Sequence, residues 1–227
     1  MTKIIPITTG MGHVYLVKQA GNAFLVDAGH KRNVRKILKS LKAHGIGKND
    51  LRFIFITHAH YDHAGGAAAL RKATGAPLII HQREAAFLQE GYMPLPKGTS
   101  PVFKALIAVG KCFGKTFAGF PPVIPDVIFT KTLELSGRFG IKGVIVHTPG
   151  HTQGSSTLLV DGNALAGDTV FNIWGGRVYP VFADDEMLLK RTWSQLLKRE
   201  IQWFYPAHGK RFSMAVFKQK AAAIGID

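Results

Sequence analysis

Five histidines and two aspartates stand at spacings typical of a two-metal hydrolytic site. Four of them lie within six residues, and three follow singly further along the chain: His58, His60, Asp62, His63, His151, Asp168 and His208. Burying so many polar side chains without partners would cost free energy. A cation removes that cost, because neutral imidazoles and carboxylates are ordinary ligands of transition metals. The spacing therefore predicts a metal centre.

Strands are predicted before every group of ligands. Residues 53–56 form a continuous apolar run, typical of a strand buried on both faces, and the first four ligands follow it. Runs rich in β-branched or aromatic residues precede the other three ligands, over 144–146, 163–166 and 203–205. The ligands are thus expected on loops at the carboxyl ends of strands, where open α/β sheets usually build their sites.

The rest of the chain alternates strand and helix patterns. Further strands are predicted over 4–7, 13–17, 23–26, 77–80 and 156–160. Helices are predicted over 33–43, 65–74, 83–90, 184–198 and 214–224, the fourth capped by Asp184 or Asp185. With 46% apolar residues, this order predicts one α/β domain over residues 1–227.

Residues 91 to about 125 differ in composition from their surroundings. They hold six of the eleven prolines and no acidic residue. One helical face carries apolar residues and its neighbour carries lysines: Val102, Leu106, Val109 and Phe113, then Lys104 and Lys111. Long connections are often functional, so we expect an inserted lid-like segment, with a plain surface loop as the alternative. Cys112, which lies in it, is expected to be a small buried hydrophobe.

The chain is strongly basic. It carries 29 Lys and Arg against 14 Asp and Glu, a formal net charge of +15 with neutral histidines. A small anionic substrate, an anionic membrane surface or nucleic acid would each suit this balance. Because the basic residues are spread along the chain, we expect no obligate nucleic-acid partner and at most weak contact with an anionic membrane surface. No oligomeric state is predicted.

Compartment is predicted from features that the sequence lacks. A single cysteine excludes an intrachain disulfide, and no apolar run approaches the ~20 residues needed to cross a bilayer. No signal-peptide pattern precedes the first strand. We therefore expect a cytoplasmic protein.

Four motifs follow one another in the order of a known enzyme family. They are Thr57-His-Ala-His-Tyr-Asp-His63, His147-Thr-Pro-Gly-His-Thr-Gln-Gly-Ser155, Gly167-Asp168 and Pro206-Ala-His-Gly209. Over Asp27 to Gly209 the chain resembles the metallo-β-lactamase superfamily of hydrolases. The resemblance implies a four-layer αβ/βα sandwich, the metallo-β-lactamase fold, with metals at one edge between two sheets.

The resemblance also divides the ligands between two ions. It implies His58, His60 and His151 on the first ion, Asp62, His63 and His208 on the second, and Asp168 between them. Three imidazoles leave an open position on zinc, so a metal-bridging hydroxide is expected to be the nucleophile. Two divalent ions are expected, with zinc preferred to iron or manganese. Asp62 is the expected catalytic residue, which orients the nucleophile and passes a proton to the leaving group.

Further predictions concern residues around the ligands. Asp27 is expected to accept a hydrogen bond from a ligand imidazole. His81 and His147 are candidates for the same role, against the alternative that they are structural histidines. Substrate contacts are predicted for Lys104, Lys111, Phe171 and Arg177.

Single residues indicate which branch of the superfamily the chain resembles. Asp168 stands where one group of β-lactamases places a thiolate, which disfavours antibiotic hydrolysis. Residues 167–171 and 175–177 resemble the glyoxalase II branch, which hydrolyses glutathione thioesters. Only 19 residues follow His208, where that branch has a helical domain, so glutathione specificity is not expected. Quorum-signal lactonases carry a tyrosine near the position of Phe171.

The expected activity is that of a dinuclear metal-dependent hydrolase. We expect it to cleave a thioester or ester bond of a small anionic substrate. The enzymatic alternatives are a lactonase, a persulfide dioxygenase with a single iron, and a β-lactam hydrolase. The non-enzymatic alternative is a protein that binds an anionic surface or nucleic acid.

Overall fold

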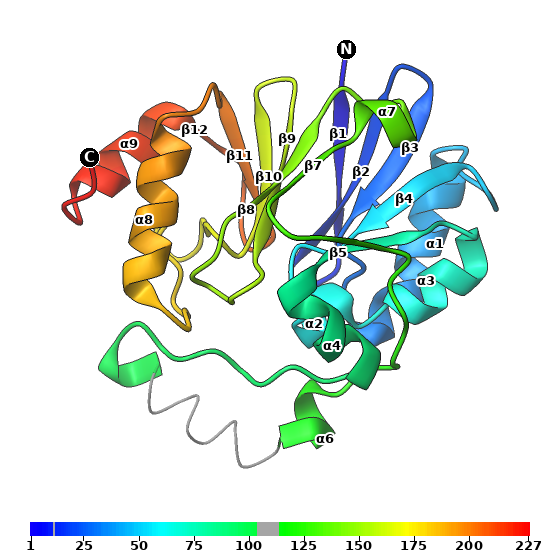
Figure 1. Cartoon of the computed structure of the whole chain (residues 1–227), viewed down its shortest axis with the longest axis horizontal. Coiled ribbons are helices and arrows are strands. Elements are labelled where there is room, and N and C mark those ends of the chain that lie inside the picture. Colours follow the sequence, from blue (N-terminus) through cyan, green and yellow to red (C-terminus); the bar gives the residue numbers. More distant parts are fainter. Residues whose placement is uncertain (11, 104–113) are drawn as a thin grey trace.

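Two six-stranded mixed sheets lie face to face in the computed structural model, which describes residues 1–10, 12–103 and 114–227 (Figure 1). The first sheet follows chain order: β1 (Lys3–Thr8), β2 (His13–Gln19), β3 (Asn22–Val26), β4 (Leu51–Phe55), β5 (Leu78–His81) and β6 (Val127–Phe129). The second runs in reverse: β12 (Phe212–Ser213), β11 (Trp203–Pro206), β10 (Asn163–Gly167), β9 (Ser156–Val160), β8 (Val144–His147) and β7 (Thr132–Glu134).

Helices cover the outer face of each sheet. The first sheet packs against α1 (Val34–Ala43), α3 (Ala67–Thr74) and α4 (Gln82–Glu90). The second packs against α8 (Glu186–Leu197) and α9 (Met214–Ala222). Shorter helical segments are η1 (Lys31–Asn33), α2 (Tyr61–Ala64), α6 (Gly114–Ala118) and α7 (Ser136–Phe139).

Strand alternation explains the four layers. In β4, Phe53 and Phe55 point into the core between the sheets, where Phe53 stacks on Phe24 with ring centroids 4.6 Å apart. Ile54, between them, packs into the separate core beneath the helices. Such a strand is buried on both faces, as its continuous apolar run predicts. The predicted αβ/βα sandwich is confirmed.

The strands and helices predicted outside the 91–125 segment are all present, with boundaries that shift by a few residues. Asp185, not Asp184, caps α8, because its side chain accepts a hydrogen bond from the Leu188 amide at 2.9 Å. The short elements η1, α2, α7, β6, β7 and β12 were not predicted. They are two to four residues long, too short for a periodic pattern to be recognised.

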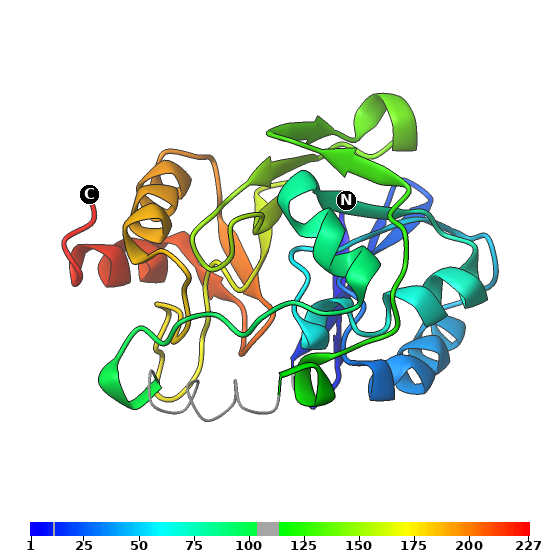
Figure 2. The ribbon, with the colours of Figure 1, turned by 60° about the horizontal axis from the view of Figure 1, so that its bottom comes forward.

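The segment predicted as an insertion is described for 91–103 and 114–125. Lys104, Leu106, Val109, Lys111, Cys112 and Phe113 lie outside the described residues. Figure 2 shows residues 91–103 crossing from the end of α4 toward the α8 side of the molecule. The Ala183 amide donates to the Lys97 carbonyl at 2.8 Å, and the Thr99 amide donates to the Val181 carbonyl at 2.9 Å. The segment thus joins the two halves of the sandwich, and its action as a lid stays a prediction.

Within the described ranges, we find no helix with both the length and the apolar character of a membrane span.

Candidate metal centre

The seven candidate ligands meet at one end of the sandwich. His58 and His60 lie in the loop after β4, whereas Asp62 and His63 lie on the short helix α2, which corrects the expectation that all four sit on a loop. The other three follow β8, β10 and β11: His151, Asp168 and His208. Six of the seven are buried or nearly so, and His208 is the most exposed, with a side-chain exposure of 20%.

One glycine fixes the approach of Asp168. Gly167 has a φ of +50°, which side-chain-bearing residues rarely adopt. A Cβ atom at this position would also lie 2.5 Å from the Thr57 hydroxyl. Glycine therefore allows β10 to turn toward the loop of His58.

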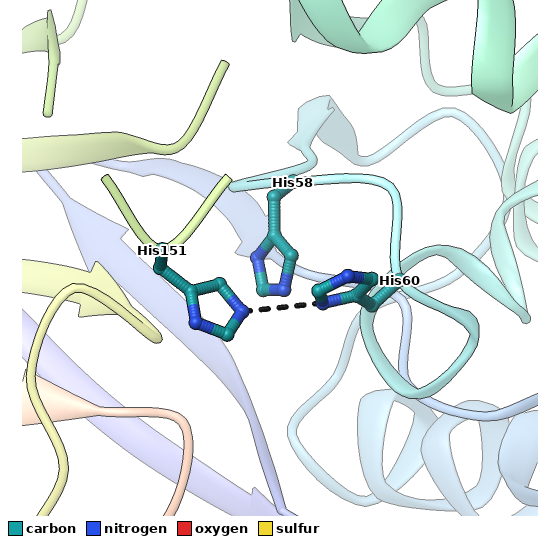
Figure 3. Close-up of side chains that lie close together, drawn as sticks. All are labelled: His58, His60 and His151. Atoms are coloured by element: carbon teal, nitrogen blue, oxygen red, sulfur yellow. Dashed lines mark hydrogen bonds between the residues drawn. The ribbon is translucent and has the colours of Figure 1, made fainter. Parts of the chain in front are cut away.

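Three histidines form the first group of ligands. Figure 3 shows the side chains of His58, His60 and His151 converging from two loops. His60 Nδ1 and His151 Nε2 are 3.2 Å apart, and one nitrogen of each ring lies within 4.8 Å of the others. Two nitrogens on a tetrahedral zinc, each at about 2.0 to 2.1 Å, would be separated by roughly 3.4 Å.

Asp168 lies between this group and the second one. Its Oδ2 atom is 3.5 Å from His151 Nε2, while its Oδ1 atom is 3.3 Å from His63 Nε2 and 3.4 Å from His208 Nε2. Asp62 completes the second group, with Oδ2 3.4 Å from His208 Nε2. The two oxygens of one carboxylate therefore face two separate sets of ligand atoms.

The buried polar atoms fit a bound cation. His58 Nε2, His63 Nε2 and Asp168 Oδ1 are all buried, and among the described residues none has a hydrogen-bond partner. Such atoms are costly to leave unpaired. Imidazole nitrogens and carboxylate oxygens are also the donor set that zinc and similar divalent metals prefer. The residues present thus match the metal that the sequence predicts.

The two groups differ in their electrostatics. Burial lowers the pKa of His58 well below its ordinary value and that of His60 to about 3, so these rings are neutral. Burial also opposes the charged form at His63 and His208, but nearby carboxylates outweigh it. They raise the pKa of His63 well above its ordinary value and that of His208 to about 10. Burial likewise disfavours an ionised Asp62, yet His63 and His208 lower its pKa to about 2. The second group therefore stabilises positive charge strongly.

Neighbouring groups orient three of the ligand rings. The Asp27 carboxylate lies 2.9 Å from His63 Nδ1 and accepts hydrogen bonds from the amide and hydroxyl of Thr57, which is the geometry its predicted role requires. The Thr57 hydroxyl also lies 3.1 Å from His58 Nδ1. The Phe182 carbonyl lies 2.9 Å from His151 Nδ1, and a backbone oxygen of this kind has no sequence signal.

Glu84 is a buried residue that the sequence analysis missed. Its Oε2 atom accepts the Ala59 amide at 2.9 Å. Its Oε1 atom accepts the Thr152 hydroxyl at 2.9 Å and the Gly154 amide at 2.8 Å. Ala59 lies between two ligands and Thr152 follows another, so one carboxylate ties both loops of the three-histidine group. The sequence could have indicated this residue, because an acidic residue four positions before the buried Leu88 lies on the inward face of α4.

His81 and His147 do not orient a ligand. Their rings stack on each other with centroids 4.0 Å apart. His81 Nε2 lies 2.7 Å from the Thr130 carbonyl, and His147 Nε2 lies 2.8 Å from the Gln153 carbonyl. These contacts favour the alternative weighed for them, structural histidines, because each Nε2 atom binds a backbone oxygen and His81 Nδ1 accepts a hydrogen bond from the Arg83 amide.

A cavity of about 340 Å³ opens beside the ligands. It is lined by His60, Tyr61, Asp62, Leu95, Pro96, His151, Asp168, Phe171, Ile173, Trp174, Val181, Phe182 and His208. Apart from the ligands and Tyr61, these side chains are apolar. Phe171, for which a substrate contact was predicted, is thus one of the residues that line the cavity.

Arg177 lies outside the set of residues that line this cavity, and its contact with substrate stays a prediction. Its guanidinium donates to the Tyr179 carbonyl at 3.3 Å and to the Thr99 hydroxyl at 3.4 Å. It also lies 5.7 Å from the ring centroid of Phe103. Phe103 in turn stacks on Trp174 at 5.7 Å. Arg177 therefore stabilises the wall of the cavity through Phe103, which stacks on the lining residue Trp174.

Comparison with known proteins agrees with the fold. Residues 7–208 match the metallo-beta-lactamase superfamily. A probable metallo-hydrolase from Methanocaldococcus jannaschii is 26% identical over 190 residues, which are 82% of each chain. A hydroxyacylglutathione hydrolase from Anaeromyxobacter dehalogenans is 31% identical over 165 residues, 72% of this chain and 47% of the relative, so the match spans about half of that relative.

Among solved structures, a motif mutant of a metallo-beta-lactamase from Cronobacter sakazakii superposes with a TM-score of 0.69 at 21% identity, over 97% of this chain and 92% of the other. At that identity the likeness concerns the fold. The family match covers most of the chain and includes all seven candidate ligands. The chain therefore belongs to the metallo-beta-lactamase superfamily and is a metal-dependent hydrolase of it.

Proposed function

We propose that the protein hydrolyses a thioester or ester bond of a small substrate at a two-metal centre. The observation that carries this proposal is the position of Asp168, whose two oxygens lie 3.5 Å from His151 on one side and 3.3 Å from His63 on the other. A carboxylate in this position reduces the repulsion between two divalent ions. His58, His60 and His151 would hold one ion, and Asp62, His63 and His208 the other.

The metal chemistry would suit acyl transfer to water. When bound, two such ions supply a water of lowered pKa and positive charge for the oxygen or sulfur that leaves. Zinc is our preferred metal, with iron or manganese as alternatives, because histidine-rich sites hold zinc well.

Asp62 is our candidate for proton transfer. It lines the cavity, and its low pKa keeps it ionised at neutral pH. It can therefore accept the proton of the attacking water and return it to the departing thiol or alcohol. The Asp62→Asn variant, which keeps an oxygen but cannot take the proton, should lose most of kcat.

The substrate class rests on the cavity and on one relative. Apolar walls from Leu95, Ile173 and Val181 suit an acyl chain or another apolar group beside the reacting carbonyl. The relative that is 31% identical is named for hydrolysis of hydroxyacylglutathione, which is a thioester. Phe171 has no hydroxyl to offer, which favours thioesters over the lactones of the tyrosine-containing lactonases.

The proposal is tested with a hydrolysis panel of thioesters, esters, lactones, phosphodiesters and a chromogenic β-lactam. We expect thioesters or esters to be turned over fastest, with activity lost in the His60→Ala variant. Metal analysis should find two ions per chain, and oxygen uptake should be nil. One bound iron with oxygen consumption on a persulfide would instead establish the dioxygenase alternative. Tight binding to anionic vesicles or oligonucleotides, without turnover, would favour the non-enzymatic one.

A further inference from the structure

Two more cavities lie near the metal centre, along the loop that carries His208. A connecting cavity of about 200 Å³ shares Ile173 and His208 with the cavity of the metal centre. A third cavity, of about 380 Å³, shares His13 and Gly209 with the connecting one. We call the third one the basic cavity, because Lys210 and Arg211 line it. Each cavity therefore shares lining residues with the next, and the three lie in a row along the loop of His208.

Hydrogen bonds fix the loop between these cavities. The His13 amide donates to the Ala207 carbonyl at 2.8 Å, and the Asn172 amide donates to the His208 carbonyl at 2.9 Å. The loop is thus held by β2 on one side and by the segment after β10 on the other. The basic cavity keeps a set position relative to the metal ligands.

Contacts with neighbouring aromatic residues fix the position of the Arg211 side chain in the basic cavity. Its Nη1 atom donates to the Tyr205 hydroxyl at 3.0 Å, and its guanidinium lies 4.6 Å from the ring centroid of Trp203. A guanidinium fixed in this way loses little freedom when it binds a carboxylate or phosphate. Of the described residues that line the basic and connecting cavities, none is acidic. An anion would meet no like charge there.

The cavity of the metal centre has the opposite character. Beyond the ligands and Tyr61 its walls are apolar, from Leu95 on one side to Val181 on the other. Placing an anionic group against such walls, away from water, would cost free energy. A substrate with an apolar and an anionic end can therefore lie in only one direction along the row of cavities.

We propose that the basic cavity binds a carboxylate or phosphate at one end of the substrate, while the apolar end occupies the cavity of the metal centre. This inference rests on the proposed hydrolysis of thioesters or esters. It assigns to Lys210 and Arg211 the anion recognition that the sequence suggested for Lys104 and Lys111.

Three thioesters of equal length test the proposal. The first carries a carboxylate at the end of the leaving thiol, as in thioesters of 6-mercaptohexanoate. The second carries the carboxylate at the far end of the acyl chain, and the third is neutral, as in thioesters of 6-mercaptohexanol. We expect the metal-loaded protein to have a lower KM for one of the two anionic thioesters than for the neutral one, and this advantage should shrink as salt is added.

A matched pair of double variants isolates the two cations. Lys210→Gln with Arg211→Gln should raise KM for the preferred anionic thioester about tenfold, with kcat and the neutral thioester unchanged. Lys190→Gln with Arg191→Gln removes the same charges from the exposed face of α8 and should change neither KM. Equal effects on all three thioesters, or equal effects of the two double variants, would overturn the proposal.

A binding measurement separates this inference from the proposed function. Calorimetry should detect 6-(methylthio)hexanoate, which has no bond to hydrolyse, on the metal-loaded protein and not on the Lys210 and Arg211 double variant. Binding without turnover of any thioester would refute the hydrolase proposal and leave the anion site. Turnover without preference for an anionic thioester, and without this binding, would refute the anion site and leave the hydrolase.

Discussion

Replacement of Glu84 is the most direct test of how the fold supports the metal centre. The carboxylate accepts three hydrogen bonds, from Ala59, Thr152 and Gly154, and is fully buried. Glu84→Ala would leave the two amides without an acceptor, while the Thr152 hydroxyl would keep Ser155 Oγ, 2.7 Å away. Each unsatisfied buried donor costs about 1 to 3 kcal/mol, so we expect a loss of roughly 2 to 6 kcal/mol in the free energy of unfolding, less where water enters.

Glu84→Gln gives a smaller and more specific change. An amide offers one oxygen, so it can keep Thr152 and Gly154 while its nitrogen faces the Ala59 amide, donor against donor. The expected loss is about 2 kcal/mol. Because Ala59 lies between His58 and His60, the affinity for the first metal ion should also fall, by roughly 10- to 100-fold.

Chemical denaturation of chelator-treated protein measures the stability, and competition with a zinc indicator measures the metal affinity. Glu90→Gln, at the exposed end of the same helix, removes the same charge and should change neither. If Glu84→Ala keeps both the stability and the zinc affinity of the unmodified protein, then the carboxylate does not hold the two loops and the reasoning is refuted.

Four more predictions concern the ligands and the cavity. Acidification should release the ion of Asp62, His63 and His208 before that of the three histidines, because protons compete best where carboxylates raise the imidazole pKa. Zinc analysis after dialysis at decreasing pH would show this order of release, and the reverse order would contradict the prediction. Without metal, His208 has a pKa raised from 6.5 to about 10, so its stabilising contribution should be complete below pH 6.5 and disappear as the pH rises through about 10. A melting temperature of chelator-treated protein that does not fall over this pH range would contradict the prediction. Asp27→Asn should weaken binding of the second ion by roughly 10- to 100-fold, because His63 loses its charged acceptor; a stoichiometry that stays at two ions in dilute protein would refute this. Trp174→Ala should raise KM for long apolar acyl thioesters and leave short ones unchanged, which a chain-length series would test.

The candidate ligands that the structure brings together and the order of the elements were predictable from the sequence. Few residue types serve as metal ligands. Ligands spaced one or two residues apart, directly after an apolar strand, form a local pattern that can be recognised from the sequence alone. The buried run of β4 and the amphipathic helices likewise carry their own periodicity. Strands of two or three residues, such as β6 and β12, carry none and were missed.

Only the tertiary structure decided how these residues work together. Asp168 faces two sets of ligand atoms because β10 and the loop after β4 meet across the two sheets, more than a hundred residues apart in the chain. Glu84 joins two ligand loops for the same reason. The apolar cavity and the basic cavity are also assembled from distant segments, such as Leu95 with Val181 and His13 with Arg211. A single sequence holds the chemistry of each side chain, whereas the pairing of distant side chains depends on how the sheets and helices pack, and no local pattern encodes that packing.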